Sequence, residues 1–254
     1  MILIKKKLKI RTMKKIILFL LITVPIFSFA QNEKVTCDYP VKPGSKEWLA
    51  VPDFTKRLEL LNIPEVLLER ISTEELVKSC LNYPEIQLVF TRNDLQLGYN
   101  FIRSSFNGFV ELESRPDAGK ELMKVYAGYK PDGFDLNSTD LEIGKFMSKF
   151  AYIEILMAQT EILNKLNPGD SKELMAICSQ KYKVKKDRQK YYGGIGLQTT
   201  ALILARQQDK KLINAKMIHG DQKINAFIKS LSFDDISLLD DIVTENDKIL
   251  SDGL

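Results

Sequence analysis

The chain has 254 residues, enough for one large domain or two small ones that each bury a hydrophobic core. Its 37 basic and 33 acidic residues amount to a formal net charge of +4, but seven of the basic residues and none of the acidic residues lie in the first thirty positions. Residues 31–254 therefore carry a charge of about −3, and they contain no basic stripe interleaved with aromatic residues. This balance argues against binding to nucleic acid or to an acidic membrane surface.

The N-terminal segment has the layout of a secretory signal peptide. A cluster of lysine and arginine residues precedes an almost continuously apolar run, Ile16–Phe29, and the small residues Ser28 and Ala30 occupy the −3 and −1 positions of a cleavage site before Gln31. The apolar run is shorter than the ~20 residues that cross a bilayer. We therefore expect export to the periplasm, the cell surface or the medium, with no transmembrane span in the mature chain. An uncleaved N-terminal anchor is the alternative.

Proline, glycine and capping residues divide the rest of the chain. We predict a signal peptide over residues 1–30, an extended lead-in over 31–45 and a helical domain over 46–254, with a candidate sub-boundary in the glycine- and aspartate-containing loop at 128–138. Four capping-box patterns, together with the lack of a clear hairpin turn, indicate an all-α fold. The expected architecture is an irregular multi-helix array, or a short solenoid-like N-terminal half, packed on a C-terminal bundle of longer helices.

The predicted helices of the first half are short and closely spaced. Pro64 stands at a tolerated first-turn position of the first helix, and Ser72 opens the second with a capping box. Asn82-Tyr83-Pro84 ends this second helix, because proline disfavours helical geometry in the residue before it. Two more helices are expected over residues 94–106 and 116–129.

The second half of the chain predicts longer helices. A capping box at Thr139 opens a segment that extends to Asn167 as one helix, about 42 Å long if unbroken, and Pro168-Gly169 ends it. Glycines at positions 193, 194 and 196 break the pattern that follows. The remaining predicted helices span residues 170–190, 197–214 and 232–250.

Three cysteines, Cys37, Cys80 and Cys178, would allow one disulfide in an exported chain, and the sequence does not choose among the three pairings. The alternative is buried free thiols, because Cys80 and Cys178 each lie within an apolar helical pattern. His219 is the only histidine, and no two cysteines are close in the sequence, which argues against a Cys/His zinc cluster. We expect no metal and no cofactor.

Glu154 is the most informative side chain for chemistry. It lies in the stretch Phe150–Ala158, which is apolar nearly all round and therefore predicts a helix at the centre of the core. A carboxylate there would lose its hydration and would need a partner. The functional interpretation is a tuned acid or base, or the polar floor of a cavity. The structural interpretation is a glutamate on the one wet edge of the helix, or one paired with a lysine or arginine from another helix.

Four other patterns have ordinary structural interpretations. Glu111 and Glu113 could form a glycosidase-like carboxylate pair, but so could many other acidic pairs. The oxygen-rich loop Asp132–Asp140 fails the EF-hand spacing, so solvation and helix capping explain it. Gly193–Gly196 could hold an anion at a helix start, but no strand precedes it and a helix-breaking turn fits better. The basic run over residues 181–190 is typical of a solvated helix face.

Five short motifs lie between about residues 60 and 125: Ile63-Pro64-Glu65, Ser72–Val77, Cys80–Pro84, Phe106-Asn107-Gly108 and Arg115–Gly119. Together they resemble a group of uncharacterised exported proteins of Bacteroidota-type bacteria. The motifs consist of helix caps and packing residues and do not form a catalytic signature. The resemblance therefore implies an exported, helical protein and brings no activity with it.

These observations favour an exported, non-catalytic helical protein that binds another protein or an envelope macromolecule, since irregular helical arrays often present concave binding faces. The alternative is a hydrolase of envelope or dietary polymers that uses only carboxylates, with Glu154 as the candidate catalytic residue. A third hypothesis, a carrier of a small ligand, would require an apolar cavity beside Glu154.

Overall fold

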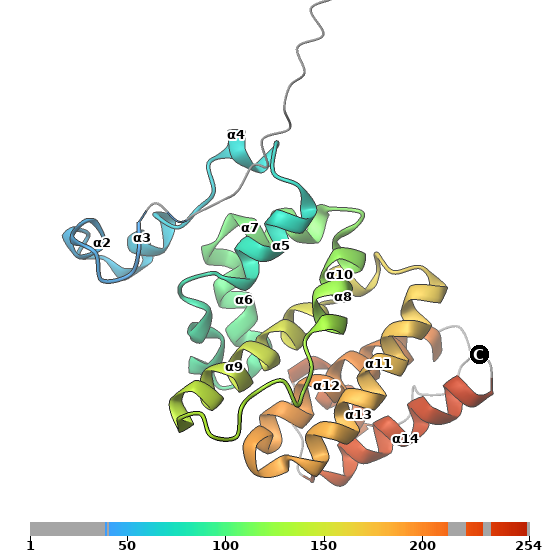
Figure 1. The fold of residues 1–254 in the computed structure, drawn as a ribbon. Helices are drawn as coiled ribbons and strands as arrows, with labels where there is room; N and C mark the ends of the chain where they lie inside the picture. Colours follow the sequence, from blue (N-terminus) through green and yellow to red (C-terminus); the bar gives the residue numbers. More distant parts are fainter. Residues whose placement is uncertain (1–38, 40, 213–221, 231–234, 253–254) are drawn as a thin grey trace, which may run out of the picture. The chain divides into compact units, whose positions relative to one another are not determined.

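The structure is helical throughout the part of the chain that it describes. It is a computed structural model, and the described residues are 39, 41–212, 222–230 and 235–252. Within these residues the elements are the α-helices α2 to α14 and one 3₁₀-helix, η1, and no strand is present (Figure 1). The predicted all-α class is confirmed, in the form of an irregular multi-helix arrangement.

The helices of the first half are short. In chain order they are α2 (Lys46–Ala50), α3 (Phe54–Glu59), α4 (Glu65–Leu68), α5 (Thr73–Leu81), η1 (Ile86–Thr91), α6 (Leu95–Ser105), α7 (Asn107–Ser114) and α8 (Ala118–Gly128). The second half holds the longer helices and two shorter ones. They are α9 (Asp140–Met157), α10 (Thr160–Leu163), α11 (Pro168–Asp187), α12 (Gln189–Leu212), α13 (Gln222–Ser230) and α14 (Ser237–Ser251).

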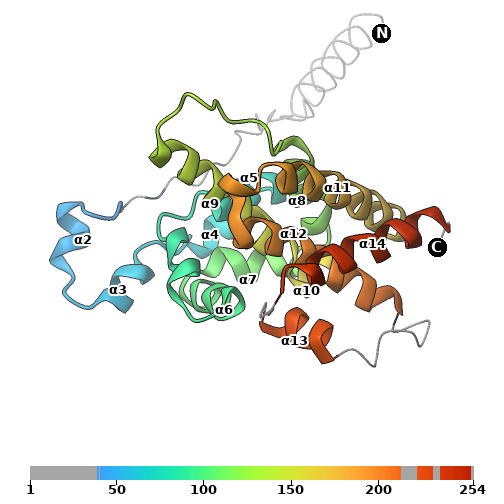
Figure 2. The ribbon, with the colours of Figure 1, turned by 90° about the horizontal axis from the view of Figure 1, so that it is seen from below.

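Helix α9 is shared by both halves of the fold. It packs against α6, α8 and η1 of the first half and against α12 of the second (Figures 1 and 2). Helices α11, α12 and α14 form a group in which each contacts the other two. The sequence of α9 explains its position, because every side chain from Phe150 to Met157 is buried, and a helix that is apolar on all sides belongs in the middle of a core.

The loop between α8 and α9, where we expected a sub-boundary, packs against the start of α12. The Tyr192 hydroxyl donates a hydrogen bond to the Pro131 carbonyl at 2.6 Å. The rings of Phe134 and Tyr191 meet edge to face, with their centroids 5.3 Å apart. The described residues belong to one compact unit, and this loop lies within it.

Short polar side chains begin several helices where the sequence places them. The Ser72 hydroxyl accepts a hydrogen bond from the Glu75 amide at the start of α5, and the Asp94 carboxylate caps α6. Thr139 and Glu142 form a reciprocal capping box at the start of α9. Each cap supplies an acceptor to an amide that has no partner within its own helix.

Two predicted boundaries in the second half are wrong. The segment from Thr139 to Asn167 is not one helix, because α9 stops and the one-turn α10 follows it. The Arg206 guanidinium donates to the Ala158 carbonyl at 2.8 Å and so satisfies the end of α9. Pro168 does not end a helix but begins α11, with Asn167 as its N-cap, since the first turn does not need the N–H that proline lacks.

The prediction also misses α2, α3, α7, η1 and α13, each of nine residues or fewer. Helices this short are marginal in isolation, so tertiary packing decides them. Helix α12 begins before the glycines, not after them, and bends at Gly193. Asn214 and Ser232, the predicted end of one helix and start of the next, lie outside the described residues. Helix α14 begins at Ser237, whose amide donates to Asp235 Oδ1 at 3.1 Å.

Basic side chains complete helix ends across the helix interfaces. Lys149 of α9 donates to the Leu81 carbonyl at the end of α5, and Lys181 of α11 donates to the Tyr129 carbonyl just beyond α8 at 2.5 Å. A cation at a helix C-terminus satisfies carbonyls that lack an amide partner and interacts favourably with the helix dipole. These contacts tie α9 and α11 to helices of the first half.

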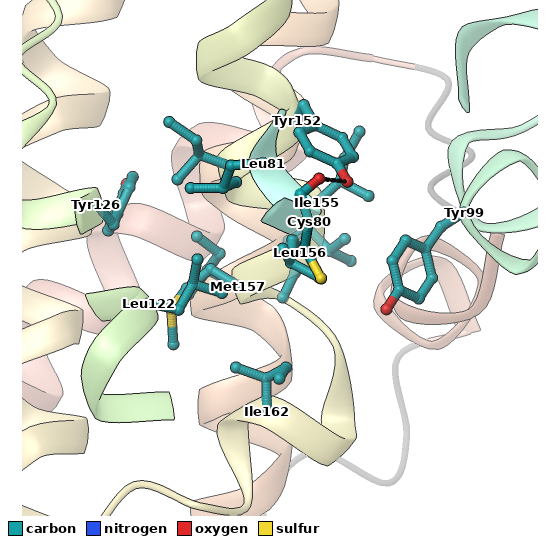
Figure 3. Close-up of a cluster of buried hydrophobic side chains, with 14 of the residues drawn as sticks. Cys80, Leu81, Tyr99, Leu122, Tyr126, Tyr152, Ile155, Leu156, Met157 and Ile162 are labelled. Carbon is teal, nitrogen blue, oxygen red and sulfur yellow. Dashed lines mark hydrogen bonds between the residues drawn. The ribbon is translucent and has the colours of Figure 1, made fainter. Parts of the chain in front are cut away.

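The core between α5, α8 and α9 is closely packed and mainly apolar. Figure 3 shows Leu122 of α8 and Cys80 of α5 beside Leu156 and Met157 of α9, all of them buried. The Tyr152 hydroxyl enters this core and donates to the Cys80 carbonyl at 2.9 Å. Its polar atom is therefore satisfied without access to water.

The close contact between α6 and η1 can be tested by substitution of a glycine at the contact. A Cβ atom added at Gly98 would lie 1.9 Å from the Val89 carbonyl oxygen, whereas one added at the exposed Gly144 of α9 would meet nothing within 4 Å. We expect Gly98→Ala to lower the free energy of unfolding by about 2 kcal/mol or more, because backbone must move. Gly144→Ala should raise it by up to about 1 kcal/mol, because alanine is the better helix former.

Urea unfolding followed by circular dichroism would measure both changes. A Gly98→Ala protein as stable as the parent would contradict the packing of α6 on η1.

Candidate functional site

Glu154, the side chain to which the sequence drew attention, is fully enclosed by protein. Its side chain and that of Lys185 each have 0% exposed surface, and Lys185 Nζ lies 2.6 Å from Glu154 Oε2. Glu154 comes from α9 and Lys185 from α11, so the pair joins two of the longer helices. The structure therefore shows one of the two structural interpretations, pairing with a basic residue from another helix.

Every hydrogen-bonding position of the Glu154 carboxylate is occupied. Oε1 accepts from the Tyr126 hydroxyl at 2.9 Å and from the Thr200 hydroxyl at 2.7 Å. Oε2 accepts from Lys185 and from the Thr199 hydroxyl at 2.5 Å. A carboxylate offers about four lone-pair sites, so none is left for a substrate or for a catalytic water.

The Lys185 ammonium group is satisfied in the same way. Its three N–H donors are directed at Glu154, at the Gly196 carbonyl at 2.9 Å and at the Thr200 hydroxyl at 3.0 Å. The Phe150 ring covers the group, with its centroid 4.0 Å from Nζ. Burial lowers the pKa of the Lys185 ammonium, and the negative charge of Glu154 opposes that shift.

The start of α12, which is rich in glycine, lies beside the Glu154–Lys185 pair and supplies several of its hydrogen-bond partners. Gly193 has φ 56° and ψ −162°, a backbone conformation that is essentially restricted to glycine. Gly196 is buried, and a Cβ there would lie 2.8 Å from the Tyr192 side chain. The predicted helix break is confirmed as a kink at Gly193. The Gly196 carbonyl accepts from the Lys185 ammonium group at 2.9 Å.

The basic run at the end of α11 is solvated only in part, because Lys183, Lys186 and Lys190 are exposed whereas Lys181 and Lys185 are buried. Lys181 is buried, and the two outer lysines face acidic residues of α14: Lys183 lies 2.8 Å from Asp247, and Lys186 lies 2.6 Å from Asp240. The acidic residues are seven positions apart, which places them on one face of α14. The exposed lysines of the run therefore pair with α14 along one side of the α11–α14 interface.

The other residues singled out by the sequence do not join this cluster as reactive groups. Cys80 and Cys178 are buried, and Cys178 carries a free thiol whose pKa is raised, chiefly by burial. Cys37 and His219 lie outside the described residues, so a disulfide that involves Cys37 stays a prediction. Within the described ranges, His, Cys, Asp and Glu side chains do not gather in a group of three that could hold a metal ion.

A surface cleft of about 800 Å³ lies between α3, α4, α6 and α7. The half-buried Phe101 and the exposed Val110 contribute apolar surface to it, and three carboxylates, those of Glu59, Glu65 and Glu111, line it. Of these three carboxylates, only Glu111 was a candidate for chemistry in the sequence. Glu59 and Glu65 come from helices of four to six residues, and their approach to α7 is a tertiary feature.

Charged partners balance two of the charges in the cleft. Arg103, which also lines it, donates through Nε to Glu113 Oε2 at 2.7 Å. Glu111 accepts from Arg115 Nε at 2.5 Å. Glu111 and Glu113, the predicted carboxylate pair, therefore each bind a different arginine.

Asparagine side chains hold the back of the cleft. The Asn107 amide donates to Asn62 Oδ1 at 2.9 Å, and the Ile63 amide donates to Asn107 Oδ1 at 2.9 Å. Asn107 Nδ2 also donates to the Ile63 carbonyl at 2.7 Å, and Arg115 donates to the Leu68 carbonyl at 2.7 Å. Because side-chain-to-backbone bonds fix these walls, the cleft is pre-formed, which reduces the entropic cost of binding.

Comparison of the chain with protein-family models, curated proteins and solved structures found no match. None of the helices within the described ranges is long and apolar enough to cross a membrane. The site must therefore be interpreted from its own geometry.

The buried pair can be tested with a double-mutant cycle. Lys185→Met and Glu154→Gln should each lower the free energy of unfolding by about 3–5 kcal/mol, because each leaves an uncompensated buried charge or polar group. The double variant should be far less destabilised than the sum of the two, because no buried charge remains. Denaturant unfolding measures all three.

Lys183→Met is the matched control, because its pair with Asp247 is exposed to solvent and should contribute at most about 1 kcal/mol. Additive effects of the two buried substitutions would show that Glu154 and Lys185 do not depend on one another.

Proposed function

We propose that this chain is an exported, non-catalytic helical protein of the periplasm or cell surface, and that it binds another protein or envelope macromolecule through the cleft between α3, α4, α6 and α7. The observation that carries the proposal is the cleft itself. It is open to solvent, it combines apolar and charged surface, and hydrogen bonds to Asn107 and Arg115 hold its walls in place. Such a surface is typical of a pre-organised binding site.

The state of Glu154 supports the non-catalytic part of this proposal. General acid or base catalysis needs a group within hydrogen-bond reach of the substrate. Glu154 is enclosed, and four protein donors already occupy its carboxylate. A carrier that binds a small ligand at Glu154 is disfavoured for the same reason, because the carboxylate has no acceptor position left for the ligand.

One observation favours the alternative, a carboxylate-dependent hydrolase of envelope or dietary polymers. The cleft brings Glu59, Glu65 and Glu111 to one surface beside the aromatic ring of Phe101. In this alternative the cleft carboxylates, and not Glu154, would flank the bond to be cleaved.

Export predicts a defined mature N-terminus. Protein recovered from the envelope or medium of the producing cells should begin at Gln31, because the small residues Ser28 and Ala30 precede that bond. N-terminal sequencing by mass spectrometry measures this directly. An intact N-terminus on protein recovered from the cytosol would contradict export.

The cleft predicts that capture of a partner depends on its open shape. Ser104 is exposed and lines the cleft, so Ser104→Trp should fill it without disturbing the core. Leu141 is 68% exposed at the start of α9 and outside the cleft, so Leu141→Trp is the matched control. We expect the parent and Leu141→Trp proteins to retain a partner from envelope extract. The Ser104→Trp protein should fail to retain it.

Equal capture by all three proteins would contradict binding in the cleft. Release of soluble fragments from an envelope polymer by the parent, and not by Glu65→Gln or Ser104→Trp, would favour the hydrolase instead.

A further inference from the structure

The cleft between α3, α4, α6 and α7 has two carboxylates without a counter-charge. Glu59 and Glu65 form no hydrogen bond or ion pair through their side chains within the described part of the chain, whereas the charges of Arg103 and Glu111 are matched by Glu113 and Arg115. The cleft therefore presents a net negative charge to a ligand.

Most of the other polar groups in the cleft are already used. The hydroxyls of Ser104 and Ser105 each donate to the Phe101 carbonyl at 2.8 Å, and Asn107 is held by its bonds to Ile63. The serine hydroxyl protons and the Asn107 amide are thus used within the protein, whereas the Glu59 and Glu65 carboxylates keep acceptor positions for a ligand rich in donors. The free carboxylates and the apolar surface carry the recognition.

The apolar surface lies among the same residues. Phe101 and Leu68 are half-buried, and Val110 is 48% exposed. Lysine and arginine side chains suit such a surface, because their aliphatic stems cover apolar groups while their charged ends reach carboxylates or water. An open cleft of about 800 Å³ accommodates a chain segment rather than one ion.

We infer that the cleft binds a basic chain segment of a protein partner, with lysine or arginine side chains lying along Phe101 and Val110 and pairing with Glu59 and Glu65. This inference rests on the proposed function and specifies the chemistry of the partner. Attraction of this kind weakens as salt rises, because both carboxylates are exposed.

The test is a selection of random linear peptides displayed on phage. Peptides are selected on the immobilised parent protein and then sorted by whether they fail to bind Ser104→Trp. We expect the cleft-dependent peptides to be enriched in lysine and arginine relative to the starting library. Their affinity should fall by about tenfold at low salt in Glu59→Gln/Glu65→Gln, because two exposed pairs are lost.

Glu173→Gln/Asp241→Asn is the matched control, because it makes the same change in net charge at two exposed residues outside the cleft. This variant should bind the selected peptides as the parent does. The inference would be overturned if the cleft-dependent peptides were not enriched in lysine and arginine, or if the two double variants lost peptide affinity equally. Either result would leave the cleft as a binding site. A selection that returns no cleft-dependent peptide would also overturn it, and capture from envelope extract would then decide the proposed function separately.

Discussion

The ion pair between Glu154 and Lys185 is fully buried and lies where three long helices meet. Glu154 belongs to α9, Lys185 to α11, and the hydroxyls and carbonyl that complete their hydrogen bonds belong mainly to α12. Two opposite charges are expensive to bury unless all their donors and acceptors are matched. Here they are matched, and any other packing of α9, α11 and α12 would leave a buried charge without these partners.

The same logic recurs where helices end. Lys149, Lys181 and Arg206 each extend from one helix to the terminal carbonyls of another. The pKa of Arg206 is lowered to about 10, chiefly because the guanidinium is buried. Long cationic side chains suit this role, because their stems pack among apolar groups and their ends donate several hydrogen bonds. Lys149, Lys181 and Arg206 thus use their charged ends within the protein.

The Glu154–Lys185 pair and the cleft lie in different parts of the fold. The buried Glu154–Lys185 pair lies among the long helices, whereas the cleft is built from helices of the first half, and hydrogen bonds from Asn62, Asn107 and Arg115 hold its walls together. Substitution of exposed residues around the cleft can therefore change binding without touching the Glu154–Lys185 pair. This separation is consistent with a binding surface supported by a rigid core, and it is the reason that the proposed function assigns no chemistry to the most buried carboxylate.

What the sequence determined by itself was local. Thr139 and Glu142 predict a helix start because they are three residues apart, and the apolar stretch around Glu154 predicts a central helix because its pattern has no polar side. Burial also indicated that Glu154 needs a partner. The identity of that partner was decided only by the tertiary structure, because Lys185 is one of several similar lysines in a basic run, and its distance from Glu154 along the chain carries no information about distance in space.

The short helices and the cleft depended on tertiary structure for the same reason. Helices of four to eight residues have too few internal hydrogen bonds to form alone, so no local pattern marks α3, α4 or α7 as strongly as it marks α9. Glu59 and Glu65 line the same cleft as Glu111, where Asn107 binds Ile63 in the segment between α3 and α4. Capping and periodicity act over a few residues and can be read along the chain, whereas charge pairing and cleft formation require the packed helices.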